Sequence, residues 1–247
     1  MLGGDTGAPR VQEPPGPPSP LVPRTDRCGP RKAGGSSPHR QASNRCVGAH
    51  RAVVAFVTSA VGFRRLKESK VHQGYVWHVV TAEYSAPDGS TFQRDIVRSP
   101  GAVGVLPLVF DSEGNAAVVL VAQYRPPYEK VVIEIPAGMR DIEGESPAQV
   151  ASRELVEEAG LVPGELSFLG EIFPSPGMTD SVTSLYLATN NTSTATDRHG
   201  PEEEHMEIMH LPLEDALAMI DRGEICDAKT VAALLLTDRR LRSADAG

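Results

Sequence analysis

The chain contains little cysteine, and the three cysteines of its 247 residues are scattered. Cys28, Cys46 and Cys226 form no CxxC pair and no Cys/His spacing typical of zinc, so neither a disulfide framework nor a zinc site is expected. No apolar run approaches the ~18–20 residues of a membrane helix. Residues 1–30 also lack the apolar stretch of a secretory signal. These absences predict a cytoplasmic protein that does not span a membrane.

Basic residues are scarce in most of the chain, and the net charge of −8 hides an asymmetry. Residues 1–51 hold eight Lys/Arg and three Asp/Glu, whereas the remainder holds 16 Lys/Arg and 29 Asp/Glu. An acidic body binds nucleic acid poorly, because phosphate neutralisation supplies most non-specific affinity. Acidic residues gathered at one place can instead hold divalent cations. We therefore expect no nucleic-acid partner for the folded part.

The N-terminal segment is rich in residues that oppose folding. Residues 1–51 hold nine of the 21 prolines and eight of the 23 glycines. Such a segment cannot bury enough apolar surface to offset its ordering entropy, so we predict a disordered tail over residues 1–60. The tail is either a passive extension, a basic arm that contacts RNA or a protein partner, or a targeting peptide.

The remaining residues predict an α/β fold. In residues 61–100, a β-rich run at 75–81, a turn at 87–90 and a returning run at 91–97 predict an antiparallel strand pair. Residues 101–247 predict a second unit that begins with a hairpin made by 102–110 and 116–123. Further strands are expected at 131–135, 166–173, 184–189 and 207–211, and amphipathic helices at 213–222 and 228–240.

A helix with clear start and stop signals follows the strand at 131–135. Ser146 is a good N-cap, Pro147 suits the first helical position, and Gln149 completes a capping box. Gly160 supplies the C-terminal stop. Small apolar residues that recur on one face suit close packing onto a sheet, namely Ala148, Ala151, Leu155 and Ala159.

Three glutamates lie on one side of this helix at i, i+3 and i+4: Glu154, Glu157 and Glu158. Like charges at this spacing oppose helix formation by a few tenths of a kcal/mol. The helix dipole adds about 0.3–1 kcal/mol for each acid near the C-terminal end. A bound cation reverses both penalties, and hard oxygen ligands suit Mg²⁺ or Mn²⁺. The alternative is a solvated acidic face in which Arg153 pairs with Glu157.

The surrounding residues match the pattern G-x5-E-x7-R-E-U-x-E-E-x-G-U, in which U is apolar. The matching residues are Gly138, Glu145, Arg153, Glu154, Leu155, Glu157, Glu158, Gly160 and Leu161. The one departure is the spacing of Gly138 and Glu145, which are separated by six residues instead of five. This pattern resembles the Nudix box, and the chain is therefore similar to the Nudix hydrolase superfamily.

Segments outside the box resemble the ADP-ribose pyrophosphatase subfamily. They are Gln123–Arg125, Glu134–Gly138, Ser175–Gly177 and Gly223–Thr230, and the resemblance covers roughly residues 65–240. It implies an α/β/α sandwich with a mixed central sheet, dependence on Mg²⁺, and a homodimer that exchanges its N-terminal strands (about 68–100). In such enzymes the second subunit helps to form the adenosine pocket.

The resemblance also implies residue roles. Glu154, Glu157, Glu158 and the Ala137 carbonyl look like metal ligands, and Arg153 resembles the arginine that orients a glutamate. Arg98 and Arg125 look like phosphate or ribose contacts, because their planar forks suit phosphate. Substrate contacts are also expected at Glu134, Pro176 and Gly177.

A general base is expected in the loop Glu202-Glu203-Glu204-His205, with Glu203 or Glu204 favoured. A glutamate with its ordinary pKa of ~4.3 is ionised at neutral pH and can accept a proton from an acidified water. The alternative is a charged mobile loop without a catalytic role. Subfamily members often carry a glutamate after Ser-Pro-Gly-x-x, where this chain has Asp180.

The predicted activity is Mg²⁺-dependent hydrolysis of ADP-ribose to AMP and ribose 5-phosphate. One alternative is a different nucleoside diphosphate sugar such as GDP-mannose, because the neighbouring subfamily shares much of the motif. A second alternative is a module that binds ADP-ribose without cleaving it. Such modules are expected to lose box glutamates, whereas the box acids of this chain are intact.

Overall fold

The computed structural model describes residues 62–110 and 113–245, so the predicted disordered tail lies outside the described residues. Three antiparallel strands form an N-terminal sheet in the order β1 (Arg64–Gln73), β2 (His78–Ser85) and β3 (Thr91–Arg98). The expected strand pair is present as β2 and β3, with β2 beginning three residues later than predicted. The turn between them is held by Asp88, whose side chain accepts the backbone N–H of Ser90.

Strand β1 is an addition to the predicted pair. Its sequence, RRLKESKVHQ, has no alternation of apolar and polar residues, and every residue in it is exposed. A strand signal in a sequence comes mainly from one buried face. Because β1 buries neither face in a single chain, its sequence carries no such signal.

The second sheet contains seven strands and has the order β12-β5-β4-β10-β9, with β6 paired to β5 and β7 paired to β4. Only β4 and β10 are parallel, so the sheet is mixed as expected. The bounds are β4 (Ala102–Phe110), β5 (Ala116–Arg125), β6 (Lys130–Glu134), β7 (Ala137–Met139), β9 (Glu165–Ile172), β10 (Thr183–Thr189) and β12 (Glu207–Pro212). Short strands β8 (Leu161–Val162) and β11 (Thr192–Ser193) pair separately.

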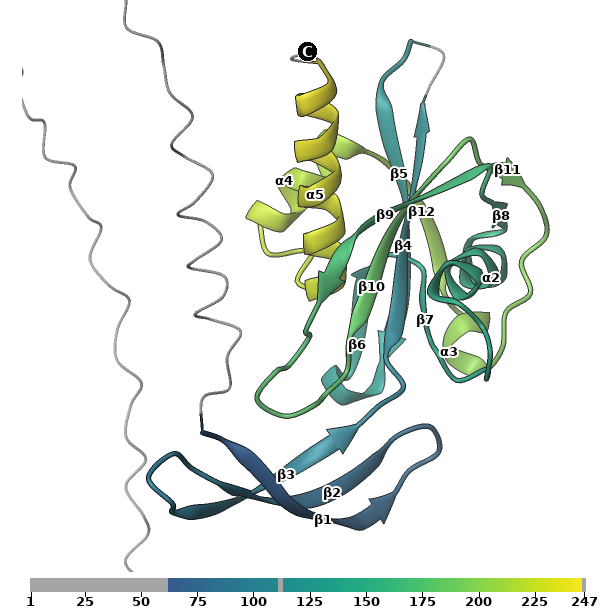
Figure 1. The fold of residues 1–247 in the computed structure, drawn as a ribbon. Coiled ribbons are helices and arrows are strands. Elements are labelled where there is room, and N and C mark those ends of the chain that lie inside the picture. The colour runs from purple at the N-terminus through teal and green to yellow at the C-terminus, as the bar shows by residue number, and fades with distance from the viewer. Residues whose placement is uncertain (1–61, 111–112, 246–247) are drawn as a thin grey trace, which may run out of the picture. The chain divides into compact units, whose positions relative to one another are not determined.

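Helices cover both faces of this sheet (Figure 1). Helices α4 (Leu213–Asp221) and α5 (Ala228–Asp245) pack on one face, and α2 (Pro147–Ala159) packs on the other, near the short α3 (Pro201–Glu204). Alternate residues of β5 serve the two cores: Leu120 belongs to the cluster under α4 and α5, and Val119 to the cluster under α2. The predicted α/β/α sandwich is therefore confirmed.

The two central strands diverge at one end of the sheet. Strands β4 and β5 pair with each other only at 108–110 and 116–118. Beyond that point β5 pairs with β6 and β4 pairs with β7. Ile135 and Pro136 link β6, which lies beside β5, to β7, which lies beside β4. Ala137 and Gly138 therefore lie where the two central strands diverge, beside α2.

Helix α2 begins and ends where its sequence predicts. Ser146 accepts the Gln149 N–H, and the Gln149 side chain accepts the Ser146 N–H at 2.9 Å, which completes the capping box. Gly160 ends the helix in the left-handed conformation, with φ 63° and ψ 37°. Among the helices of the described residues, none is long and apolar enough to cross a membrane.

Candidate active site

A cavity of about 330 Å³ lies between α2, α3 and the split in the sheet. We call it the carboxylate cavity, because Glu154, Glu157 and Glu158 of α2 and Glu203 of α3 all line it. The remaining lining residues are Arg153 of α2 and residues of β5, β7 and neighbouring loops: Gln123, Arg125, Ala137, Gly138, Met139, Asp141 and His199. The structure thus brings together the predicted metal-binding residues and one predicted base.

Two of the three box glutamates on α2 are deeply buried. Glu154 is 7% exposed and Glu158 is 3% exposed. Burial raises the pKa of Glu154 to about 7, against the opposing effect of Arg153. Burial likewise raises the pKa of Glu158 to about 8, although the Ala137 N–H opposes this and donates to Oε2 at 2.9 Å. Since burial disfavours a carboxylate charge, these side chains need a cation or a proton.

Arg153 joins the box acids to each other. Its Nη1 lies 2.8 Å from Glu154 Oε1 and 3.0 Å from Glu157 Oε2, and its Nη2 lies 3.3 Å from Glu145 Oε2. The arginine therefore orients two cavity glutamates and fixes Glu145 in the preceding loop. These contacts include the simple pairing of Arg153 with Glu157, and the role expected from the resemblance stays a prediction.

The residues around Glu154 and Glu158 fit a divalent cation chemically. All the side-chain donors are hard carboxylate oxygens, which suit Mg²⁺. Gly138 leaves the space that the Glu154 carboxylate occupies, since a Cβ at this position would overlap that carboxylate. Within residues 62–110 and 113–245, however, no three His, Cys, Asp or Glu side chains converge as a ready-made metal site. Arg153 and the Ala137 N–H hold the carboxylates instead.

Of the three glutamates considered as the base, Glu203 is the one that lines the carboxylate cavity. Glu202 and Glu204 are exposed and are not among the residues that line it. The segment is the helix α3 and not an irregular loop, and Glu203 Oε2 accepts the His199 N–H at 2.7 Å. The structure therefore places Glu203, and not Glu204, in the carboxylate cavity. The sequence alone does not distinguish between these two glutamates.

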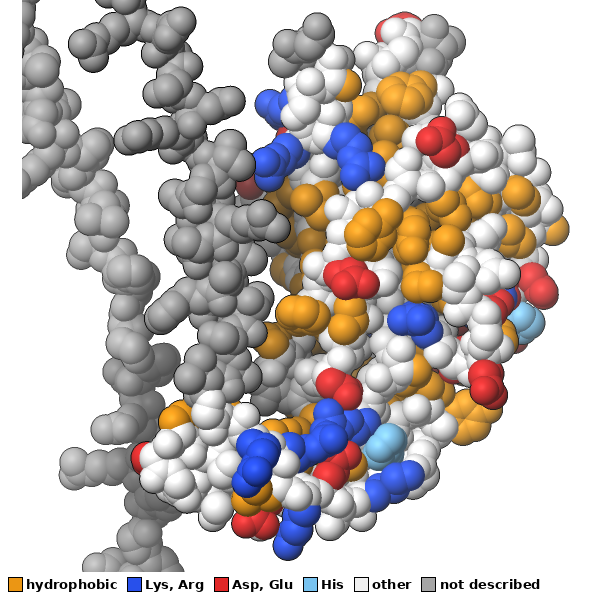
Figure 2. All heavy atoms as spheres, viewed as in Figure 1, with side chains coloured by type: hydrophobic (Ala, Val, Ile, Leu, Met, Phe, Trp, Pro, Cys, Tyr) orange, Lys and Arg blue, Asp and Glu red, His pale blue; other side chains and the backbone are white. Residues whose placement is uncertain are grey.

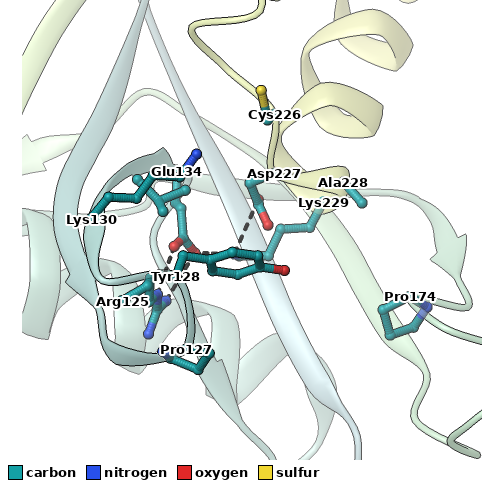
Figure 3. A pocket seen from close by; sticks show the side chains of 11 residues that line it. Arg125, Pro127, Tyr128, Lys130, Glu134, Pro174, Cys226, Asp227, Ala228 and Lys229 are labelled. Atoms are coloured by element: carbon teal, nitrogen blue, oxygen red, sulfur yellow. Dashed lines mark hydrogen bonds and ion pairs between the residues drawn. The ribbon is translucent and has the colours of Figure 1, made fainter. Parts of the chain in front are cut away.

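A second cavity, of about 440 Å³, adjoins the carboxylate cavity through Arg125, which lines both. Figure 3 shows Arg125, Glu134 and Lys229 meeting at this cavity, which we call the Lys229 cavity. Arg125 grips both oxygens of Glu134, with Nε to Oε1 at 2.6 Å and Nη2 to Oε2 at 2.9 Å. Lys229 forms an ion pair with Glu134, and its Nζ also lies 3.1 Å from Asp227 Oδ2. Glu134, predicted as a substrate contact, thus holds two basic side chains in place.

We expect Glu134→Gln to lower the free energy of unfolding by about 3 kcal/mol, because it leaves Arg125 and Lys229 without a full counter-charge. Burial alone acts to raise the pKa of Glu134, but Arg125 and Lys229 outweigh it and lower that pKa. Urea denaturation measures the change. The matched control, Glu224→Gln, removes an exposed pair with Arg222 and should change the free energy of unfolding far less, because water screens the pair. Equal stabilities for the two variants would contradict the expectation.

Arg98, Pro176 and Gly177 line a third cavity of about 440 Å³, which shares no lining residue with the carboxylate cavity. We call it the aromatic cavity, because Phe63, Tyr84 and Phe92 also line it. Arg98 pairs there with Glu68 and with Asp180, whose Oδ2 lies 3.0 Å from Nη1. Asp180 also accepts the Ser99 N–H at 3.1 Å. In a single chain, these predicted substrate contacts therefore stand apart from the box glutamates.

The sequence predicts no individual role for Gln123, Asp141 and His199, which line the carboxylate cavity, or for Lys229, which lines the neighbouring one. Gln123 stands in an apolar strand, and this interruption of the apolar pattern was an available signal. Lys229 reaches Glu134 across 95 residues of sequence, and no local pattern predicts that contact.

Fold and site together define an α/β/α protein with a helix-borne cluster of carboxylates. Comparison with known proteins shows the family: residues 99–234 match the NUDIX domain. An ADP-ribose pyrophosphatase of Bacillus subtilis (strain 168) is 34% identical over 171 residues, covering 69% of this chain and 90% of that protein. A GDP-mannose pyrophosphatase of Klebsiella pneumoniae subsp. pneumoniae is 30% identical over 167 residues, covering 65% of this chain and 83% of that protein.

A solved structure supports the same fold. The crystal structure of an ADP compounds hydrolase superimposes with a TM-score of 0.64 at 22% identity, covering 76% of this chain and 98% of that chain. The chain belongs to the Nudix family and is a Nudix hydrolase.

Proposed function

We propose that this Nudix hydrolase cleaves the pyrophosphate bond of ADP-ribose and releases AMP and ribose 5-phosphate. The observation that carries the proposal is the carboxylate cavity, in which buried Glu154 and Glu158 face Glu203 of another element. The name of the Bacillus subtilis relative supports ADP-ribose as the substrate. Cytoplasmic residence remains a prediction from the sequence.

The residues of the cavity divide the reaction between them. Glu154, Glu157, Glu158 and the Ala137 carbonyl would hold Mg²⁺, with Mn²⁺ as an alternative. When bound, the cation neutralises the diphosphate and acidifies a water. Glu203 accepts a proton from the water as its oxygen attacks one phosphorus, and the bond from that phosphorus to the bridging oxygen breaks. Arg125, held by Glu134, has Nη1 free of that ion pair to donate to the diphosphate.

GDP-mannose is the second candidate substrate, because the Klebsiella pneumoniae relative is a GDP-mannose pyrophosphatase. Non-catalytic binding of ADP-ribose is the candidate from another class. Intact box glutamates and a base candidate in the same cavity favour catalysis over binding alone.

A substrate panel in Mg²⁺ tests the proposal, with ADP-ribose, GDP-mannose, NADH and diadenosine polyphosphates as substrates and Glu158→Gln as the inactive control. We expect the highest kcat/KM on ADP-ribose. A tenfold preference for GDP-mannose would overturn only the substrate. Absence of cleavage above the control, with ADP-ribose still bound in calorimetry, would favour the binding module.

We further propose a homodimer in which the N-terminal sheet contributes to the partner's substrate site. Figure 2 shows Lys and Arg side chains gathered over this sheet, and β1 is exposed throughout, with Val71 60% exposed. A second copy would cover this surface and bring Arg98 to a substrate held by the partner. Light scattering at micromolar concentration should give twice the mass of the chain, and a monomer would remove the proposal.

A further inference from the structure

Thr230 joins the first turn of α5 to the segment that links β6 to β7. The residue is fully buried, with 0% exposure. Its Oγ1 accepts the Ile135 N–H at 2.8 Å. The same hydroxyl donates its single hydrogen to Asp227 Oδ2 at 2.6 Å, so its lone pairs are left for Ile135. Because Ile135 follows the last residue of β6, its N–H lies outside the strand pairing and takes this hydroxyl as its acceptor.

The three residues after β6 are each held by a different element. The Ile135 N–H is held by α5, and the Pro136 carbonyl accepts the Val105 N–H of β4 at 2.9 Å. The Ala137 N–H donates to Glu158 Oε2 of α2 at 2.9 Å. The ring of Pro136 fixes one backbone dihedral of this short link, which leaves it little freedom to absorb a movement. A shift of the Ile135 backbone should therefore reach Ala137 and the buried carboxylate of Glu158.

Helix α5 begins without help from the Thr230 hydroxyl. Asp227 caps the helix by accepting the Thr230 N–H at 3.0 Å, and the Asp227 carbonyl accepts the Val231 N–H at 2.9 Å. Both bonds use backbone N–H groups, which Thr230→Val would keep. The acceptor side of the hydroxyl thus serves the link between β6 and β7 and not the helix that carries it.

We propose that Thr230 is a positioning residue for the carboxylate cavity. Its hydroxyl fixes the end of β6, so that the Ala137 N–H meets the Glu158 carboxylate and the Ala137 carbonyl keeps its place beside it. This inference rests on the proposed hydrolysis, in which Ala137 and Glu158 hold Mg²⁺. Thr230 acts on them only through the backbone and does not contact the substrate. Groups that hold metal ligands in this way commonly contribute 10- to 100-fold to metal affinity or activity.

Thr230→Val keeps the shape of the side chain and removes the hydroxyl. We expect kcat to fall about 10- to 100-fold, because the segment that carries Ala137 loses an anchor. KM should change much less, since a residue with no exposed surface cannot touch the substrate. The Mg²⁺ concentration that gives half-maximal activity should rise. Steady-state kinetics across a Mg²⁺ titration, well below the melting temperature of each variant, measures all three quantities.

A conservative variant separates positioning from stability. Thr230→Ser keeps the hydroxyl and loses a buried methyl group, so its melting temperature should fall while its kcat stays close to that of the wild type. A merely structural role would make kcat follow the melting temperature in both variants, and that result would overturn the inference. Wild-type kcat in Thr230→Val would overturn it as well.

Thr237→Val is the matched control on the same helix. Thr237 is also fully buried, but its Oγ1 has no hydrogen-bond partner among the described residues. The substitution makes the same chemical change two turns further along α5, where no hydroxyl bond is lost. We expect wild-type kcat and an equal or higher melting temperature. A loss of kcat as large as that of Thr230→Val would contradict the inference, because any buried threonine of α5 would then have the same effect.

Amide NMR of the metal-free protein gives a readout that does not depend on catalysis. In Thr230→Val the Ile135 N–H should exchange faster with solvent, and the Ala137 amide resonance should shift as its bond to Glu158 changes. If the wild type cleaves no diphosphate, the proposed function fails, but a shifted Ala137 resonance would still support the link from Thr230. Normal cleavage by the wild type, with kcat and the Ala137 resonance unchanged in Thr230→Val, would refute the inference alone.

Discussion

Replacing Glu158 by glutamine is expected to lower kcat/KM by about 10³-fold or more. The change keeps the size of the side chain and removes the charge of the most buried carboxylate in the cavity, which is 3% exposed. Losing one preorganised electrostatic partner of a transition state commonly costs 10²–10³-fold, and the same change should also weaken the proposed binding of Mg²⁺. Steady-state kinetics on the preferred substrate of the panel, across a Mg²⁺ titration, measures the loss.

Stability gives an independent readout for this variant. A ligand that binds only the folded protein raises the melting temperature with its concentration. Mg²⁺ should therefore stabilise the wild type and have a much smaller effect on Glu158→Gln. Glu165→Gln, an exposed acid on β9, serves as the control and should match the wild type in both assays. More than a tenth of wild-type activity in Glu158→Gln would rule out Glu158 as an essential ligand.

Local sequence signals predicted the central helix well, because they act over a few residues. The capping box at Ser146 and Gln149 and the stop at Gly160 are complete within α2 itself. Local signals did not predict β1, because this strand buries no face. They also did not predict α3, because a helix of four residues is too short to show a periodic pattern. Most of the sandwich could be predicted because its strands and helices each carry an apolar face that the opposite layer covers.

The site was less predictable than the fold, because burial depth depends on the whole sheet. Helical spacing predicts that Glu154, Glu157 and Glu158 lie on one side of the helix, but it does not predict how deeply each of them is buried. The split between β4 and β5 lets β7 approach α2, and this contact buries Glu154 and Glu158 more than Glu157. The neighbouring ion pairs join residues of distant segments, such as Glu134 with Lys229, so they emerge only from the folded chain.

Gly138→Ala is expected to lower kcat/KM by about 10²-fold while costing only about 1–3 kcal/mol of stability. The backbone of Gly138 is not among the glycines with positive φ, so alanine fits its conformation. The added methyl group would overlap the Glu154 carboxylate, which must then move. That carboxylate is the end of a flexible side chain, so the fold survives. Circular dichroism with denaturation, beside kinetics, measures the two effects separately.

A double-mutant cycle shows whether the methyl group acts through Glu154. If its only effect is to displace that carboxylate, Gly138→Ala should reduce activity strongly in the wild type and hardly further in Glu154→Gln. Independent, additive losses of activity would instead mean that Gly138 contacts the substrate or the proposed cation directly. The cycle therefore tests whether position 138 needs a glycine only for the space that it leaves to Glu154. Because β7 lies against α2 at this point, we expect a single methyl group to disturb the arrangement of carboxylates on which the proposed hydrolysis depends.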